Sequence, residues 1–109
     1  MLDISFFILN SGSIIGFEIS GHAGYANYGA DIVCSAVSSV CYMVVNTITD
    51  VLKLDIKLDV DEQRGYMYVL VRNENVLDCQ TLFQGLKIHI LMIEKMYPKN
   101  LKVSYKEVD

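Results

Sequence analysis

Hydrophobic side chains change their spacing along this chain from every second residue to every third or fourth residue, and this happens twice. Alternation is typical of a strand with one buried face, whereas spacing of three and four residues is typical of one face of a helix. Alternation returns once more near the end of the chain. The pattern predicts strands at residues 2–9, 15–19, 56–61, 66–72 and 101–106, and helices at residues 32–52 and 76–97.

This order of elements, strand-strand-helix-strand-strand-helix-strand, predicts an α+β fold in two layers. We expect a mainly antiparallel sheet with two helices packed on one face. The sequence has no repeat, linker or shift in composition, so residues 1–109 are expected to form a single domain. The predicted apolar face of the first helix consists of Val37, Val40, Cys41, Val44, Val45, Ile48, Val51 and Leu52.

Local signals predict where the helices begin and end. Asp31 is the expected N-cap of the first helix, and Asn75 with Asp78 forms an expected capping pair for the second. Pro98 is expected to stop that helix, because the residue before a proline disfavours helical geometry. The apolar face of the second helix is Leu82, Phe83, Leu86, Ile90, Ile93 and Tyr97. It is widened by Ile88, Leu91, Met92 and Met96, which fits either a subunit interface of a homodimer or extra core.

Composition excludes several classes of protein. Hydrophobic residues make up 52% of the chain, too many for a disordered segment. The net charge of −4 argues against direct nucleic-acid binding, which relies on clustered lysine and arginine. The long uncharged stretch at residues 32–49 is interrupted by serine, asparagine and threonine, so we expect a buried helix and no membrane span. With no basic secretion signal at its start, the protein is expected to be cytoplasmic.

The three cysteines have no paired spacing, which indicates free thiols and no metal site. Cys34 is expected in the first turn of the first helix, where the helix dipole favours a thiolate. His22 ends the second strand, and the loop between them has room to bring the two side chains together. The residues are therefore a candidate nucleophile and general base, with the backbone amides of Cys34 and Ser35 as candidate oxyanion donors.

Other interpretations remain open from spacing alone. Cys34 continues the apolar stripe of Val37 and Cys41 and fits a buried small side chain. A lone histidine at the end of a strand, such as His22, is more often a hydrogen-bonded structural residue than a base, and a thiol-based redox sensor is a further alternative. Asp31 fits a helix cap better than a third catalytic residue that orients His22.

Several residues around this pair are candidates for binding a substrate. Ser38 lies one helical turn after Cys34 on the same face and is expected to line the cleft. The loop between His22 and the helix is predicted to be a flap that covers an extended peptide. The candidate flap and binding residues are Gly21, Ala23, Gly24, Tyr25, Tyr28 and Gly29.

The segments Gly21-His22-Ala23, Asp31-Ile32-Val33-Cys34 and Ala36-Val37-Ser38 resemble the ribosomal-processing cysteine protease family, called Prp. The resemblance extends over the whole chain, from the opening hairpin to the strand after Tyr97-Pro98. One departure is Ser35, which stands where the family commonly has alanine.

The resemblance implies a cytoplasmic cysteine endopeptidase, generally a homodimer, that needs no cofactor. Its substrate would be a large-subunit ribosomal protein, the twenty-seventh in the standard numbering. The enzyme would remove the short N-terminal extension of that protein by cutting after a pair of phenylalanines. On this resemblance His22 matches the general base and Cys34 the nucleophile. The alternative is a ribosome-associated module that binds the same peptide without cutting it.

Overall fold

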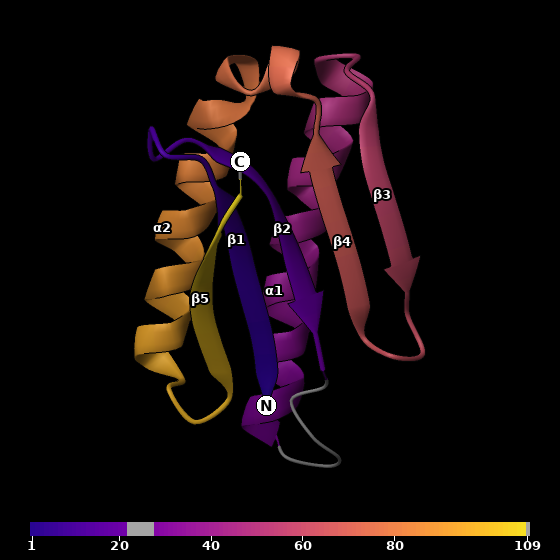
Figure 1. Ribbon diagram of the computed structural model, residues 1–109. Coiled ribbons are helices and arrows are strands. Elements are labelled where there is room, and N and C mark those ends of the chain that lie inside the picture. The colour runs from indigo at the N-terminus through magenta and orange to yellow at the C-terminus, as the bar shows by residue number, and fades with distance from the viewer. Residues whose placement is uncertain (22–27, 109) are drawn as a thin grey trace.

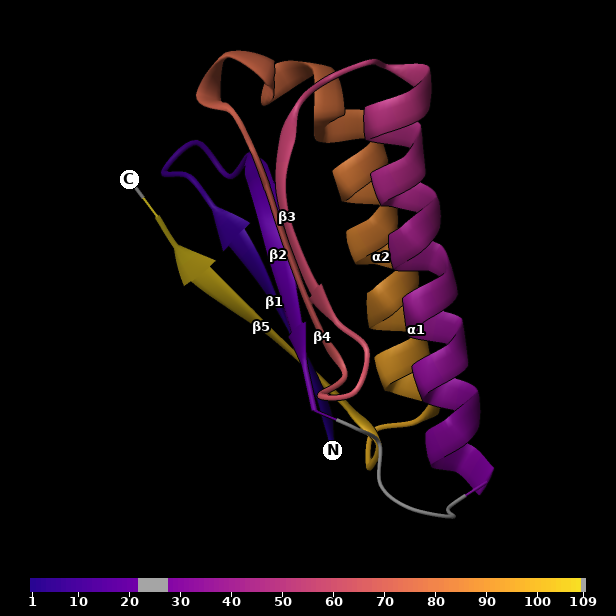
Figure 2. The same cartoon turned by 90° about the vertical axis from the view of Figure 1, so that its right-hand side faces the viewer.

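The computed structural model describes residues 1–21 and 28–108, with the backbone alone for residues 28–31. Within this part, the strands form one sheet in the order β3-β4-β2-β1-β5. Figure 1 shows the sheet in front of two long helices, and Figure 2 shows that both helices cover the same face. The predicted α+β class and order of elements are therefore confirmed. The strands are β1 (Leu2–Ile8), β2 (Ile14–Ser20), β3 (Ile56–Asp61), β4 (Tyr66–Val71) and β5 (Leu101–Glu107).

The sheet is antiparallel except where β5 pairs with β1 in parallel. Strands β2 and β3 point the same way, as do β4 and β5, so each helix is a crossover between parallel strands of one sheet. Such crossovers are right-handed. The crossover through α1 moves toward the β3 edge of the sheet, and the crossover through α2 moves toward the β5 edge. The strands that α1 connects also point opposite to those that α2 connects. With the same handedness, the two helices therefore lie on the same face of the sheet.

Helix α1 (Tyr28–Asn46) continues into a turn of π-helix, η1 (Thr47–Val51). Its buried face matches the predicted stripe from Val37 to Ile48, except that Val40 is only partly buried, and it also includes Val33, which was not predicted. The fully buried residues are Val33, Val37, Cys41, Val44 and Ile48. The stretch Ile32–Val51 is apolar and long enough to cross a membrane by length and composition alone. Here its apolar stripe packs on the sheet, as expected for a core helix.

The predicted stripe was wrong at its end, where Val51 and Leu52 are exposed. The reason is the π-helical turn, in which the Leu52 N–H donates to the Thr47 carbonyl at 2.9 Å. A turn widened by one residue rotates the residues that follow it away from the core.

Helix α2 (Gln80–Met96) ends before Pro98 as predicted, but its predicted capping pair was wrong. Two short 3-10 turns, η2 (Asn73–Asn75) and η3 (Leu77–Cys79), occupy the segment of Asn75 and Asp78, without a side-chain cap bond. Instead the side chain of Gln80 binds the backbone of Ile14. It accepts the Ile14 N–H at 2.8 Å and donates to the Ile14 carbonyl at 2.7 Å. This contact attaches the start of α2 to β2.

The main apolar face of α2 is buried as predicted at Phe83, Leu86, Ile90 and Ile93. Of the four residues that widen this face, Leu91 is partly buried and the other three are not extra core. Ile88 is 67% exposed, Met92 49% and Met96 61%. Of the two interpretations, packing within the monomer is excluded for these three side chains, and the subunit interface stays a prediction.

Candidate functional site

A cavity of about 280 Å³ lies between the first half of α1 and the sheet. Its floor is formed by three buried apolar side chains, Leu2, Ile19 and Met67, from the first, second and fourth strands. One wall is α1, and the other is the end of the hairpin made by β3 and β4. The remaining lining residues are Gly21, Cys34, Ser38, Tyr42, Val60, Glu62, Gly65 and Tyr66.

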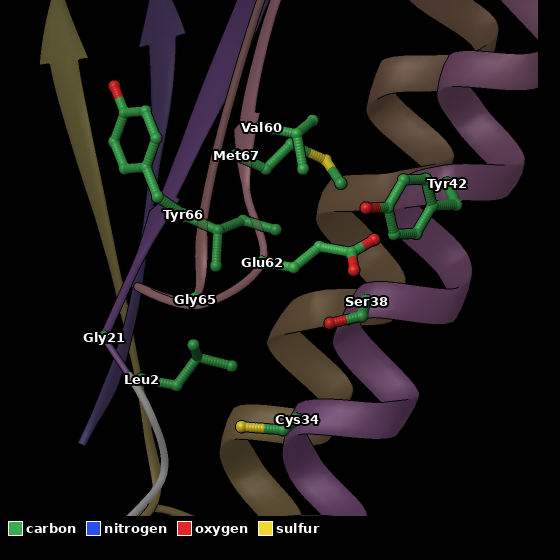
Figure 3. A pocket seen from close by; sticks show the side chains of 11 residues that line it. Leu2, Gly21, Cys34, Ser38, Tyr42, Val60, Glu62, Gly65, Tyr66 and Met67 are labelled. Carbon is green, nitrogen blue, oxygen red and sulfur yellow. The ribbon is translucent and has the colours of Figure 1, made fainter.

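Helix α1 supplies its wall through Cys34, Ser38 and Tyr42, which are spaced by four residues. Residues four apart lie one above the other on the same face of a helix. Figure 3 shows the sulfur of Cys34 and the hydroxyl of Ser38 pointing from α1 toward the sheet. The structure therefore places Cys34 and Ser38 together in one cleft, as the spacing predicts.

The fold treats the three cysteines differently. Cys34 is half-buried and lines the cavity, whereas Cys41 and Cys79 are buried in the core. Burial raises the pKa of the Cys41 thiol from 9.0 to about 12. The pKa of Cys79 is also raised, first by burial and then by the charge of Asp78. Of the three thiols, that of Cys34 is the one that lines the cavity.

The start of α1 differs from the prediction. The helix begins at Tyr28, so Asp31 is its fourth residue and not its N-cap, and Cys34 lies in the second turn and not the first. The predicted flap is correspondingly shorter, because Tyr28 and Gly29 are helical. The segment from Tyr28 to Asp31 contains no residue that prevents helix formation, as a proline would. The helix can therefore begin before Asp31, the residue that the local signal predicts as its cap.

This earlier start corrects the expected oxyanion donors. Only the first four N–H groups of a helix lack a partner within it. Those groups belong to residues 28–31, whereas the amides of Cys34 and Ser35 come later in α1. Within a helix they donate to carbonyls four residues earlier, so they are not available as predicted.

Four of the predicted site residues, His22, Ala23, Gly24 and Tyr25, lie outside the described residues. The side chains of Tyr28 and Asp31 lie outside them as well. Gly21, the residue before His22, lies at the edge of the cavity. Its φ is +92°, and a Cβ there would come within 2.7 Å of the Met1 carbonyl oxygen. Glycine is therefore required at this point by both conformation and space.

Sequence reasoning missed the hairpin wall, which contributes Val60, Glu62 and Gly65. No local pattern connects these residues to Cys34, because the crossover through α1 brings them into place. Tyr42 was also missed, although its helical spacing from Cys34 was a usable signal. Among the described residues, no group of three or more histidine, cysteine, aspartate or glutamate side chains is arranged to hold a metal ion. A half-buried thiol above an apolar floor suits covalent attack on a bound apolar substrate.

Comparison with known proteins connects this site to a family. Residues 1–102 match the family model described as cysteine protease Prp. The ribosomal processing cysteine protease Prp of Bacillus subtilis is 33% identical over 95 residues, which are 84% of this chain and 85% of that protein.

Two solved structures of the ribosomal processing protease Prp from S. aureus have the same fold, each covering 97% of this chain and 100% of theirs. The structure in complex with a substrate peptide superposes with a TM-score of 0.88 at 25% identity. The structure with a covalently linked product peptide superposes with a TM-score of 0.86 at 25% identity.

Proposed function

The chain belongs to the Prp family of cysteine proteases, and from that membership we propose that it removes the short N-terminal extension of the twenty-seventh large-subunit ribosomal protein. The observation that carries the proposal is the half-buried thiol of Cys34 at the wall of an apolar cavity. We further infer that residues 1–109 act as one protease domain.

Cys34 is the proposed nucleophile and His22 the proposed general base. In this mechanism His22 takes the thiol proton, and the sulfur attacks the carbonyl carbon of the scissile bond. The leaving amine takes the proton back from His22, and water then hydrolyses the thioester. The position of Gly21 at the cavity supports the role of His22, which follows it directly in the chain. The covalently linked product peptide of the S. aureus relative supports a covalent intermediate.

Asp31 is retained as a proposed orienting residue for His22, because it is not needed as a helix cap. It lies three residues before Cys34 in α1, and residues three apart share a helix face. Ala23, Gly24 and Tyr25, together with the helical Tyr28 and Gly29, are proposed to contact the bound peptide.

The apolar floor of Leu2, Ile19 and Met67 supports a substrate whose cleavage point carries aromatic side chains. Burial of such side chains is the main source of affinity that a cavity of this composition offers. No cofactor is needed in this mechanism, since a thiol and an imidazole supply the nucleophile and the base.

The remaining proposals concern partners and compartment. Cys34, Cys41 and Cys79 form no disulfide bond, which fits a reducing compartment and supports the cytoplasm. The net charge of −4 favours a basic ribosomal protein over direct contact with nucleic acid. The exposed apolar side chains of Met92 and Met96 support a homodimer.

The test is incubation of the purified protein with the extended ribosomal protein, read by intact mass. We expect the wild type to release a fragment that ends in two phenylalanines. Cys34→Ala is expected to release none, and His22→Ala to lower kcat/KM by about 10²- to 10⁴-fold. Cys79→Ala is the matched control, since it removes a thiol far from the cavity, and it is expected to cleave normally.

Cleavage by Cys34→Ala at the wild-type rate would refute the nucleophile. Tight binding of the extension by the wild type without cleavage would instead favour the peptide-binding module.

A further inference from the structure

The wall of the cavity opposite α1 includes the turn between β3 and β4, and this turn carries a carboxylate. Glu62 is the first residue of the turn, and its carbonyl accepts the Gly65 N–H at 3.2 Å. Figure 3 shows the side chain of Glu62 extending from the hairpin toward α1, near Ser38 and Tyr42. Among the described residues that line the cavity, Glu62 is the one with a charged side chain.

Neighbouring cations do not neutralise this carboxylate. Arg64, in the same turn, pairs with Asp61 at 3.0 Å between Nε and Oδ2. The Arg64 guanidinium also lies over the Tyr66 ring, 5.2 Å from its centroid. In the described part of the chain, the Glu62 side chain has no ion pair and no hydrogen bond of its own.

The surroundings of Glu62 strengthen its interaction with a bound cation. Val60 and Met67 lie in the same cavity, and apolar walls lower the local dielectric constant. Glu62 is itself exposed, so water screens part of the attraction. An ion pair of this kind is expected to change binding by about three- to fivefold.

Helix geometry gives the place of such a cation along a bound peptide. Ser38 and Tyr42 lie four and eight residues after Cys34, which is about 6 Å and 12 Å along the helix axis. An extended peptide advances about 3.3 Å per residue. A side chain that reaches Glu62 therefore belongs to a residue about two to four positions from the bond that Cys34 attacks.

We propose that Glu62 is a specificity-determining residue that binds a lysine or arginine side chain of the substrate, about two to four residues from the scissile bond. The inference rests on the proposed function, because it requires a peptide in the cavity of Cys34. It adds a charge requirement to a site whose other described walls are apolar or neutral.

The experiment uses quenched fluorescent peptides that carry two phenylalanines before the scissile bond. One lysine is moved through the third and fourth positions before that bond and through the second, third and fourth positions after it, and each peptide has a glutamine analogue. Wild type, Glu62→Gln and Glu62→Lys are compared by kcat and KM. Glu74→Gln is the matched control, because Glu74 is an exposed carboxylate in η2, outside the cavity.

We expect the wild type to prefer lysine over glutamine at one position by about three- to fivefold in kcat/KM, mainly through KM. Glu62→Gln is expected to lose this preference, Glu62→Lys to disfavour lysine, and Glu74→Gln to keep the preference. Added salt is expected to weaken the preference of the wild type. A wild type without a lysine preference at any position, or a Glu62→Gln variant that keeps one, would overturn the proposal.

Failure of the proposed function would have a different signature, namely no cleavage of any peptide by the wild type. The Glu62 inference is then decided by peptide affinities, measured with the wild type, Glu62→Gln and Glu62→Lys. A lysine preference in binding that disappears with Glu62→Gln would support it, and equal affinities would overturn it.

Discussion

Alkylation of the folded protein should distinguish the three cysteines, because the fold buries their thiols to different extents. The pKa of Cys41 rises from 9.0 to about 12 on burial. At pH 8, a thiol with a pKa of 9.0 is about 10% thiolate, whereas one with a pKa of 12 is about 0.01% thiolate. Since alkylation proceeds through the thiolate, Cys41 should react about 1000-fold more slowly in the folded protein than in the unfolded chain.

The assay is reaction with iodoacetamide at pH 8, native and in guanidinium chloride, followed by mass mapping of the peptides. Cys34 should be labelled in the native protein, because it is half-buried beside an open cavity. Cys41 and Cys79 should be labelled only after denaturation. The Cys34→Ala variant should take up no label while folded.

Labelling of Cys41 in the folded protein within tenfold of the Cys34 rate would refute this reasoning. Transient unfolding would not explain such labelling of Cys41, because a domain whose free energy of unfolding is about 5 kcal/mol is unfolded less than about 0.1% of the time. A Cys34 that resists iodoacetamide until denaturation would equally contradict the open cavity. Loss of peptide cleavage in step with Cys34 labelling would connect the reactive thiol to the proposed activity.

Two further predictions concern stability. Gly16→Ala should lower the free energy of unfolding by about 3 kcal/mol, because its Cβ would lie 2.1 Å from the Val69 carbonyl oxygen. The control is Gly85→Ala, whose Cβ meets no atom within 4 Å, and it should raise the free energy of unfolding by about 1 kcal/mol. Both variants are measured by urea unfolding. Equal effects of the two substitutions would refute the steric argument. The hydrogen bond that Tyr66 donates to Glu18 at 2.8 Å raises the Tyr66 pKa from 10.0 to about 12. The stabilising effect of this hydrogen bond is therefore complete below pH 10 and is lost between pH 10 and 12. The difference in free energy of unfolding between the wild type and Tyr66→Phe should shrink over that range. A difference that does not change with pH would contradict the prediction.

The sequence predicted the elements of the fold because each one repeats its own hydrophobic period. The errors lie where a local signal competes with its surroundings. Asp31 has the chemistry of a helix cap, yet α1 begins three residues earlier. Val51 and Leu52 keep the helical spacing, yet the π-helical turn before them changes the direction of their side chains. A period read from sequence assumes a constant number of residues per turn, and that assumption fails there.

The site was predicted only in the part that is local in sequence. Cys34 and Ser38 share a helix face, which spacing reveals. Glu62 belongs to the same cavity, but it is 28 residues from Cys34 and is brought there by the crossover between β2 and β3. Only the order of strands in the sheet places the hairpin beside α1. The order of the strands depends on pairing between distant segments, and it leaves no periodic pattern in the sequence.

The cavity follows from covering five strands with two helices. Neighbouring strands lie about 4.8 Å apart and a helix covers about 10 Å, so two helices cover about four strands. The uncovered strand is β3 at the edge of the sheet, where Leu58 is 45% exposed and Val60 37% exposed. In Figure 1, α1 crosses the sheet obliquely, and the turn end of the β3–β4 hairpin extends beyond it.

An apolar strand without a covering helix exposes hydrophobic side chains to water in the free protein, and a ligand gains affinity by burying them. A peptide with apolar side chains that enters between α1 and the hairpin would cover Val60 and complete the second layer. The same geometry places Cys34 at one end of that peptide's path and Glu62 farther along it, near Ser38 and Tyr42. In the proposed function, binding and cleavage therefore share one structural origin: the peptide occupies space that the two helices leave open, and the half-buried thiol of Cys34 lies on the helix that borders that space.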